Sequence, residues 1–329
     1  MNNRRVVLAS RPQGWVSEAN FRLEESPLAS PREGEVLVKN LWLSLDPYMR
    51  GRMSDAKSYV KGVELGEVMV GQTVGEVIES RTEKLAPGDK VLTQLGWQLY
   101  GATREATRVD EKRAPLSCYL GVLGMPGMTA YFGLKEIGQP KAGDTVVVSA
   151  ASGAVGSVVG QLAKLWGCRA VGVAGGARKC DYVKRELGFD DCVDYKAGNL
   201  AAALKEACPE AVDVYFDNVG GEIFDTVLAQ MSLLSRVVVC GLIADYNATE
   251  PYRLRNWRSV LVNRIRLQGM IVFDWKERHG EALEVLAGYF AEGRLKYRES
   301  VLAGLENAPR GLVALLKGEN FGKQLVRLA

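Results

Sequence analysis

The sequence predicts an α/β protein in which a β-rich part is combined with a doubly wound parallel sheet. Near the N-terminus, short runs of β-branched and apolar residues are separated by recurrent glycines, as in a barrel-like domain. From Asp144 onward, short apolar runs alternate with stretches of helical periodicity, which is typical of a parallel sheet covered by helices. A chain of 329 residues is long enough to hold both domains.

The β-rich part is expected to begin at the N-terminus and to end near residue 125. Its strands are expected at Glu35–Leu43, Gly71–Ser80 and Lys90–Thr93. A turn at Pro87–Asp89 precedes the last of these. Proline and glycine cluster again in Gly121–Gly127, where we expect the chain to leave this domain.

The second part is expected to contain the parallel sheet and its helices. Its strands are expected at Thr145–Ser149, Arg169–Val173, Asp191–Val193, Val212–Phe216, Arg236–Cys240 and Arg264–Met270. A long helix is expected at Lys276–Glu292. Apolar runs at Ser300–Leu302 and Gln324–Leu328 are able to return to the first domain. The predicted domains are therefore 1–125 with 300–329, and 126–299.

Composition excludes several classes of function. The net charge is only +3 and no run of five Lys or Arg occurs, so nucleic acid is not an expected partner. No segment approaches the roughly 18 apolar residues that span a membrane, and the start lacks the apolar stretch of a signal peptide. The six cysteines show no Cys-x-x-Cys spacing and are expected to be reduced. A cytoplasmic location is expected.

The chain contains one histidine, His279. Histidine supplies most general bases and most zinc ligands, so any mechanism that needs His elsewhere in the chain is excluded. His279 lies late, in a charged and helix-like stretch, and is expected at the surface. No metal site is predicted.

A glycine-containing loop follows the first strand of the parallel sheet. Ala150–Gly156 reads AASGAVG, and the next helix begins within it. Glycines in such a loop let backbone approach a pyrophosphate, whose charge is favoured at the helix N-terminus. The first glycine of the usual fingerprint is replaced by Ala150 or Ala151. The loop lies between a buried strand and an amphipathic helix, so it predicts a dinucleotide site rather than an ordinary turn.

The end of the second strand indicates which dinucleotide is bound. NAD sites usually carry Asp or Glu at this point to hold the ribose 2′-hydroxyl. Here the sequence is Ala174–Lys179, AGGARK, with no acid before Asp181. Small residues leave room for a 2′-phosphate, and Arg178 and Lys179 supply positive charge. NADP(H) is therefore predicted, the alternative being a solvated helix start.

Several segments resemble the zinc-independent medium-chain reductases, and most closely the group of NADPH-dependent 2-alkenal or alkene double-bond reductases. This group includes the leukotriene B4 dehydrogenase/prostaglandin reductase and bacterial curcumin reductase types. The matching segments are Leu43–Met53, Met125–Tyr131, the glycine loop, Gly188–Lys196, Asp217–Gly221, Cys240–Asn247 and Gly318–Lys323. The resemblance implies a GroES-like catalytic domain built from both chain ends, a Rossmann domain between them, and a homodimer.

The resemblance also implies a set of cofactor-binding residues. In chain order they are Gly153, Ala154, Val155, Gly156, Lys179, Tyr195, Asn218, Cys240, Gly241, Leu242, Ile243, Tyr246, Met270, Ile271, Val272 and Asn320. The first four would line the pyrophosphate, and Lys179 and Tyr195 would hold the 2′-phosphate end. Asn218 would contact the cofactor near the sheet edge, the segments after it would pass the nicotinamide half, and Asn320 would contact that end from the C-terminal return.

Hydride transfer to an α,β-unsaturated carbonyl substrate needs neither metal nor His. The hydride attacks the β-carbon, and a hydroxyl donor stabilises the resulting enolate. Tyr246 is the first candidate for this donor and Tyr48 the second. Alternatively, Tyr246 shapes the pocket wall and Tyr48 anchors the barrel. An NADPH:quinone reductase and a non-catalytic NADPH-binding protein remain as alternative functions.

Aromatic and sulfur-containing side chains are candidates for an apolar substrate cleft. They are Trp97, Tyr100, Tyr59 and Met125. Ligand sites often carry such side chains, but residues of this kind are more often part of a hydrophobic core. The sequence therefore predicts the reaction class and leaves the substrate open among long-chain alkenals, aromatic enones and curcumin-like diketones.

Overall fold

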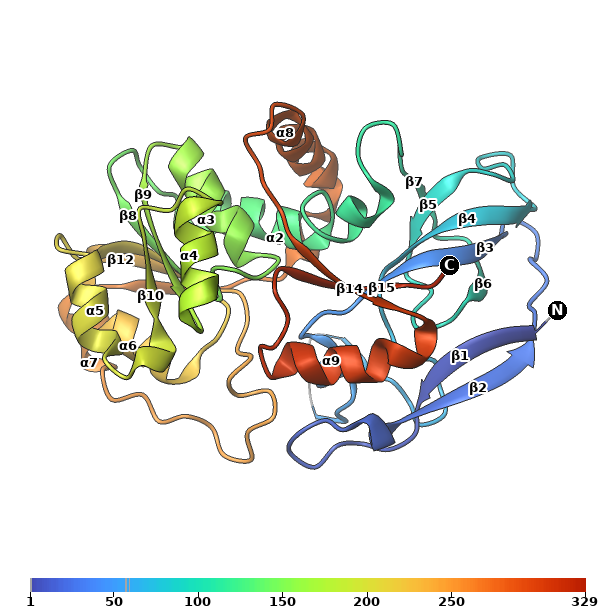
Figure 1. Cartoon of the computed structure of the whole chain (residues 1–329), viewed down its shortest axis with the longest axis horizontal. Helices are drawn as coiled ribbons and strands as arrows, with labels where there is room; N and C mark the ends of the chain where they lie inside the picture. Colours follow the sequence, from blue (N-terminus) through green and yellow to red (C-terminus); the bar gives the residue numbers. More distant parts are fainter. Residues whose placement is uncertain (1, 57, 59) are drawn as a thin grey trace. The chain divides into compact units, whose positions relative to one another are not determined.

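The computed structural model describes residues 2–56, 58 and 60–329. The chain forms two compact units, Met1–Gly121 with Glu299–Ala329, and Val122–Arg298 (Figure 1). Tyr59, one of the candidates for the substrate cleft, lies outside the described residues. Among the described residues, no helix is long and apolar enough to cross a membrane.

The first unit is built on a mixed sheet that includes both ends of the chain. Its strands, in spatial order, are β14 (Glu299–Ala303), β15 (Lys323–Arg327), β3 (Val36–Ser44), β4 (Thr73–Ser80), β5 (Lys90–Thr93) and β7 (Thr107–Arg108), and β6 (Tyr100–Thr103) also pairs with β3. All neighbours are antiparallel except β14 and β15. Val326 of β15 pairs with Leu43 of β3. The predicted return of the C-terminal segment to the first sheet is therefore observed.

A separate hairpin and short helices complete this unit. They are β1 (Asn2–Leu8), β2 (Phe21–Pro27), η1 (Glu18–Asn20), α1 (Met49–Arg52), η2 (Leu116–Leu120), η6 (Leu305–Asn307) and α9 (Ala308–Leu316). Trp97 is fully buried in this unit and stacks on Phe21, with ring centroids 5.1 Å apart. Of the two interpretations of Trp97, the structure supports a core residue.

The second unit contains a six-stranded parallel sheet, counted over residues 122–298. Its strands, in spatial order, are β10 (Asp191–Asp194), β9 (Arg169–Ala174), β8 (Thr145–Ser149), β11 (Val212–Asp217), β12 (Met231–Val239) and β13 (Arg266–Gly269). The order reverses between β8 and β11, which is the doubly wound arrangement of a Rossmann fold. The α/β class and the parallel sheet predicted from the sequence are confirmed.

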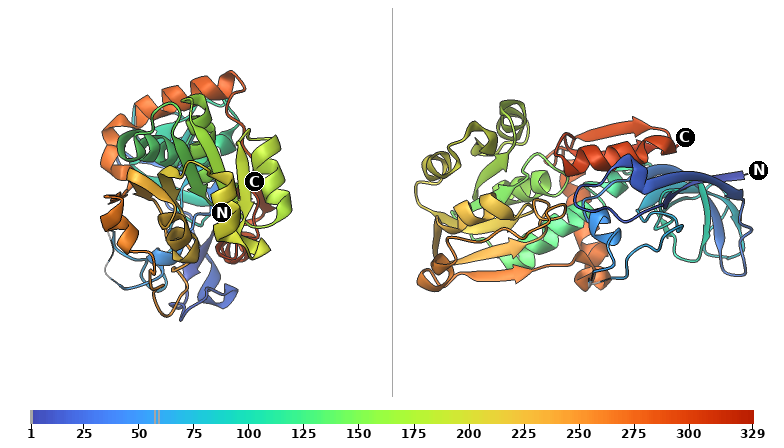
Figure 2. Two further views of the ribbon diagram at one scale, coloured as in Figure 1. Left: turned by 90° about the vertical axis from the view of Figure 1, so that its left-hand side faces the viewer. Right: turned by 90° about the horizontal axis from the view of Figure 1, so that it is seen from below.

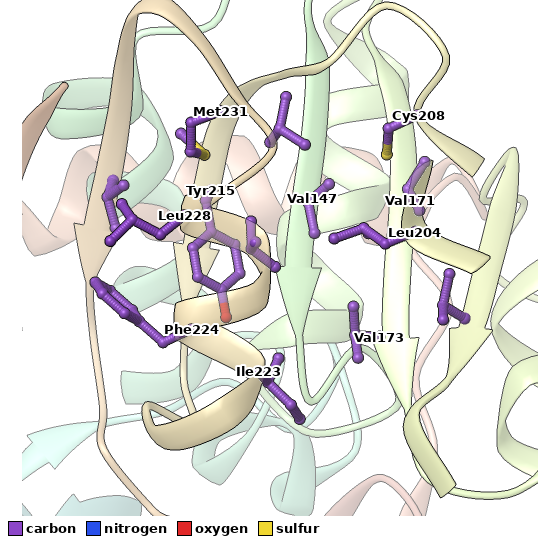
Figure 3. Packing of buried hydrophobic residues seen from close by; sticks show 14 of the residues in the cluster. Val147, Val171, Val173, Leu204, Cys208, Tyr215, Ile223, Phe224, Leu228 and Met231 are labelled. Atoms are coloured by element: carbon purple, nitrogen blue, oxygen red, sulfur yellow. The ribbon is translucent and has the colours of Figure 1, made fainter. Parts of the chain in front are cut away.

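Helices cover both faces of this sheet (Figure 2). They are α2 (Met125–Phe132), η3 (Gly133–Gly138), α3 (Gly156–Leu165), α4 (Ala177–Arg185), η4 (Tyr195–Ala197), α5 (Leu200–Ala207), α6 (Gly221–Leu228), α7 (Arg258–Val262), η5 (Val272–Arg278) and α8 (His279–Ala291). Neighbouring residues of β11 point to opposite faces. Tyr215 packs with Phe224 of α6 (Figure 3), whereas Phe216 lies against Gly133.

Two predicted elements differ from the structure by more than two residues at an end or by being divided. Strand β12 begins at Met231 and not at Arg236. The single helix expected at Lys276–Glu292 is a 3-10 segment, η5, followed by α8. The boundary between them is Arg278, with φ −108° and ψ 7°. A second departure from helical geometry lies inside η5 at Trp275, with φ −110° and ψ 22°, and the ring of this residue stacks on Phe132 at 5.6 Å.

Candidate active site

The predicted cofactor residues of the second unit lie just after the carboxyl ends of its parallel strands. Gly153 follows β8, Lys179 follows β9, Tyr195 follows β10, Asn218 follows β11, Cys240 follows β12 and Met270 follows β13. In doubly wound folds, ligands bind at this edge of the sheet, where the strand order reverses. The topology therefore gathers residues that are far apart in the sequence along one edge.

The loop between β8 and α3 makes a tight turn at Ala150. This residue has φ +51°, in the left-handed region that favours glycine, and its carbonyl accepts a hydrogen bond from Gly153 N at 2.9 Å. The position of the missing first glycine is thus the strained Ala150. A Cβ added at Gly156 would lie 2.4 Å from Ala150 O, so only glycine allows the helix to begin this close to the strand.

Helix α3 begins at Gly156 and spans ten residues. The first N–H groups of a helix have no intrahelical partner, and its dipole favours an anion there. Gly153, Ala154 and Val155 are half-buried in front of this N-terminus. The loop therefore fits the pyrophosphate of a dinucleotide by its shape and by its charge.

Lys179 lies in the first turn of α4, at the end of β9. Its side chain is half-buried, and burial together with the charge of Lys196 lowers the pKa of its ammonium group. A Cβ added at Gly175 would lie 2.9 Å from the ring and hydroxyl of Tyr195, so this ring lies against the glycine. The structure thus brings Lys179, Gly175 and Tyr195 to one end of the sheet, as the 2′-phosphate prediction requires.

Asp194, the last residue of β10, directly precedes Tyr195, and its carboxylate accepts hydrogen bonds from the backbone. Its Oδ1 accepts hydrogen bonds from Gly176 N at 2.8 Å and from Lys196 N at 2.9 Å. It therefore ties the loop after β9 to the loop after β10. Because the carboxylate comes from β10 and not β9, it does not occupy the position at which NAD sites hold a ribose.

A buried carboxylate, Asp217, organises the middle of the edge, and the sequence did not single it out. Its Oδ1 accepts hydrogen bonds from Ser149 Oγ at 2.9 Å and Tyr215 Oη at 2.6 Å, and its Oδ2 accepts one from Gly220 N at 2.9 Å. Burial raises the pKa of this carboxyl group. A buried charge is tolerated only with such partners. The segment Asp217–Gly221 carried the only signal, as part of the resemblance.

Asn218 is held to the neighbouring strand β8 through both its backbone and its side chain. Its backbone N–H donates to Ser149 Oγ at 2.8 Å, and its side-chain Nδ2 donates to Ser149 O at 2.8 Å. Ser149 is the last residue of β8, so Asn218 bridges the two strands at which the order reverses. A side chain held this way is preorganised for a ligand at the edge.

The segment Cys240–Tyr246 follows β12 and is held against β11. Cys240 N and Gly241 N donate to Asp217 O at 2.8 and 3.1 Å. Tyr246 Oη, half-buried, accepts a long hydrogen bond of 3.4 Å from Leu242 N, so the phenol folds back over its own segment. Burial raises the pKa of the Cys240 thiol to about 12, so the thiol stays protonated.

The segment Met270–Val272 continues from β13. Met270 N donates to Val239 O at 3.1 Å, and its buried side chain packs toward Gly133. His279 Nε2 lies 3.2 Å from Val272 O and donates to it, since a carbonyl only accepts. His279 is therefore half-buried, which corrects the expectation of a surface residue.

The two remaining candidates belong to the first unit. Tyr48 is half-buried and directly precedes α1. Asn320 donates from Nδ2 to Gly322 O at 2.8 Å. Their segments are joined, because Lys323 Nζ donates to Asp46 Oδ1 at 2.6 Å. The ion pair links the chain around Tyr48 to the chain around Asn320.

Within residues 2–56, 58 and 60–329, no three or more His, Cys, Asp and Glu side chains lie together in a way that could hold a metal ion. All six cysteines are free thiols, and five of them are buried.

Comparison with known proteins identifies the family. Residues 4–110 match the sequence profile described as N-terminal domain of oxidoreductase, and residues 154–288 match the profile described as zinc-binding dehydrogenase. The NADPH-dependent curcumin reductase of Escherichia coli (strain K12) is 50% identical, over 99% of this chain and 97% of that protein. The chain belongs to the NADPH-dependent alkenal reductase group of the zinc-independent medium-chain reductases.

Other members of this reductase group match over the full length. The 2-alkenal reductase (NADP(+)-dependent) of Nicotiana tabacum is 41% identical, over 100% of this chain and 98% of that protein. The crystal structure of CurA from Vibrio vulnificus in complex with NADPH is 47% identical, covers 99% of both chains and has a TM-score of 0.95. The GroES-like plus Rossmann architecture predicted from the sequence is confirmed by this likeness.

Proposed function

We propose that this reductase uses NADPH to reduce the C=C bond of α,β-unsaturated aldehydes and ketones, without a metal. The proposal rests on the groups that lie together at the edge of the parallel sheet. A glycine loop fitted to a pyrophosphate and a half-buried Lys179 lie there in a chain that is half identical to a curcumin reductase. The substrate is a small electron-poor alkene conjugated to a carbonyl.

The residues of the second unit bind and orient the cofactor. The loop Gly153–Gly156 and the N-terminus of α3 would hold the pyrophosphate, and Lys179 with Tyr195 would hold the 2′-phosphate. Asn218, fixed by Ser149, would contact the cofactor at the point where the strand order reverses. The segments Cys240–Tyr246 and Met270–Val272 would pass the nicotinamide half.

When bound, NADPH supplies the hydride that is added to the β-carbon of the substrate. Negative charge then develops on the carbonyl oxygen of the substrate, and a hydroxyl donor aimed at that oxygen stabilises the enolate. A proton from water or from a hydroxyl group then adds to the α-carbon, which completes the reduction of the C=C bond. Tyr246 is the first candidate for this donor. The hydrogen bond from Leu242 N to its oxygen polarises the phenol and makes it a better donor. Tyr48 is the second candidate.

We also propose that the two units are the catalytic and NADPH-binding domains, with boundaries near residues 125 and 300. The catalytic domain would then be 1–125 with 300–329. A cytoplasmic location is proposed as well, because six free thiols, five of them buried, suit a reducing compartment.

A homodimer is proposed, supported by an apolar surface at the edge of the parallel sheet. Its residues are Leu233, Leu234, Trp257, Leu261 and Val262, all more than half exposed. Leu234 N donates to Asn263 O at 2.7 Å, so the two parts of this surface adjoin. Contiguous exposed apolar side chains mark interaction sites. Light scattering of the purified protein, and of the Leu261→Glu variant, measures whether a dimer forms and whether it depends on this surface.

The experiment that tests the reaction is NADPH oxidation by metal-free protein with an alkenal, an aromatic enone, a quinone and a simple ketone, with NADH in parallel. Turnover of the alkenal or the enone with NADPH, unchanged by chelator, is expected. Turnover of the quinone alone would replace the proposal with a quinone reductase. Tight NADPH binding without turnover of any substrate would favour a binding protein.

A further inference from the structure

We propose that Lys196 is a second cation for the 2′-phosphate of NADPH and thereby a determinant of cofactor specificity. The proposal rests on the NADPH assignment above and adds a residue that neither the glycine fingerprint nor the end of β9 points to. It follows from the way in which two loops of the second unit are tied together.

Backbone hydrogen bonds hold Lys196 close to the end of β9. Lys196 lies in η4, which follows β10, whereas Lys179 lies in α4, which follows β9. One carboxylate oxygen, Asp194 Oδ1, accepts hydrogen bonds from both Lys196 N and Gly176 N. These two bonds hold η4 directly against the loop that precedes α4. Lys196 is therefore placed beside the 2′-phosphate end by a local structure and not by a flexible surface loop.

The side chain of Lys196 extends over Gly175. A Cβ added at Gly175 would lie 3.0 Å from Lys196 Cε, so the lysine stem crosses the end of β9. The same added atom would lie 2.9 Å from the ring of Tyr195. Lys196 Nζ is 6.0 Å from the centre of that ring. The small Gly175 thus leaves space over which Lys196 and Tyr195 both extend.

The ammonium groups of Lys179 and Lys196 carry like charges. Burial lowers the pKa of Lys179, and the charge of Lys196 lowers it further, as expected where two ammonium groups lie near each other. The carboxylate that lies near them, Asp194, already accepts two backbone N–H groups. Like charges held together by the fold favour an anion between them.

A 2′-phosphate is the part of the cofactor that suits two ammonium groups. It carries about −1.5 to −2 charges at neutral pH and offers three acceptor oxygens. A ribose 2′-hydroxyl carries no charge and gains little from a second lysine. Lys196 should therefore affect binding of NADPH and leave binding of NADH nearly unchanged. A solvated Lys196, by contrast, would affect neither cofactor.

The experiment compares the full chain with its Lys196→Gln variant by calorimetry, using 2′,5′-ADP and 5′-AMP as probes. The Kd of 2′,5′-ADP is expected to rise about five- to tenfold, with the Kd of 5′-AMP unchanged. Lys196→Arg should keep most of the affinity. Lys184→Gln is the control for loss of a lysine elsewhere in this region, because Lys184 lies on α4, as Lys179 does, but pairs with Asp191 at 3.7 Å.

The remaining outcomes separate failure of this inference from failure of the NADPH assignment. If Lys179→Gln weakens 2′,5′-ADP binding and Lys196→Gln does not, Lys196 is a solvated residue and the inference is wrong. An equal loss for both probes would mean that Lys196 only supports the loop, which also overturns it. If neither lysine matters and NADH serves as well as NADPH, the NADPH assignment itself fails.

Discussion

Lys323 and Asp46 form an ion pair inside the first unit, with Nζ 2.6 Å from Oδ1 and side chains only 5% and 7% exposed. Lys323 Nζ also donates to Leu45 O at 2.8 Å, and Ser44 Oγ donates to the other oxygen of Asp46. The two charged residues are 277 positions apart in the chain. The pair therefore joins the segment before Tyr48 to the C-terminal strand.

The first prediction is that Lys323→Met lowers the free energy of unfolding by about 3–5 kcal/mol, because it leaves the Asp46 charge buried and unpaired. Asp46→Asn should also be destabilising, because burial already opposes the charge of Lys323 and lowers its pKa. Urea denaturation measures both. In the double variant Asp46→Asn/Lys323→Met most of the loss should return. Additive losses in the double-mutant cycle would contradict the pairing.

Strands that are buried along their whole length were predicted well from the sequence, and irregular or partly polar strands were not. The strand Thr145–Ser149 was predicted with its observed bounds, because every residue of it is buried and three consecutive valines form its centre. The start of β12 at Met231 was not predicted. Leu234, within this strand, has a left-handed backbone with φ +60°, and residue propensities give no sign of such an irregularity. The hairpin of β1 and β2 was not predicted, since polar residues make up much of both strands.

The contacts within the site could not be predicted where they join residues that are far apart in the sequence. The segments of Asp46 and Lys323 were both noted, but nothing in their sequences shows that they touch. Asp217 was noted only within a matching segment, since its role depends on partners from β8 and β11 that the fold brings together. The roles assigned to individual cofactor residues stay predictions, because they concern a ligand.

The second prediction concerns Gly156→Ala. The new Cβ would meet Ala150 O at 2.4 Å, so α3 or the loop must move, and we expect about 1–3 kcal/mol of destabilisation. NADPH affinity should fall with it. Gly153→Ala is the comparison, because its Cβ would lie 3.1 Å from the same oxygen. That variant should change stability little, so equal losses of stability in both, measured by thermal unfolding, would contradict the prediction.

The third prediction concerns Tyr246→Phe. The variant keeps the ring but loses the hydroxyl donor, so turnover of an enone should fall by about 10²-fold, with the Kd of NADPH unchanged. Stopped-flow measurement of NADPH oxidation and a binding titration give the two values. Tyr48→Phe is measured in parallel. Unchanged turnover in Tyr246→Phe would assign the tyrosine to the pocket wall, and a loss in Tyr48→Phe alone would exchange the two roles.

The fourth prediction concerns pH and the contact of α8 with α2 and η3. Arg278, Lys135 and Tyr131 bind the Glu281 carboxylate and lower its pKa from 4.5 to about 2. A lowered pKa contributes stability that is present above the unfolded value and is lost as pH falls toward the folded value. Glu281→Gln should therefore lower Tm at pH 7, and the difference from wild type should disappear between about pH 5 and 2. Glu277→Gln, an exposed control, should show no such difference.

The last prediction links the pH dependence of cofactor binding to the two lysines. Burial, and secondarily the charge of Lys196, lowers the pKa of Lys179 below its usual 10.5. A bound 2′-phosphate favours the protonated lysine, so the affinity for 2′,5′-ADP should fall as pH rises through that lowered pKa. Lys196→Gln removes the smaller cause of the lowered pKa, so the alkaline loss of affinity should move to higher pH. Lys179→Gln removes the group with the lowered pKa, so the loss of affinity over this pH range should become smaller. Calorimetry between pH 7 and 10 tests this, and identical profiles for 2′,5′-ADP and 5′-AMP would contradict it.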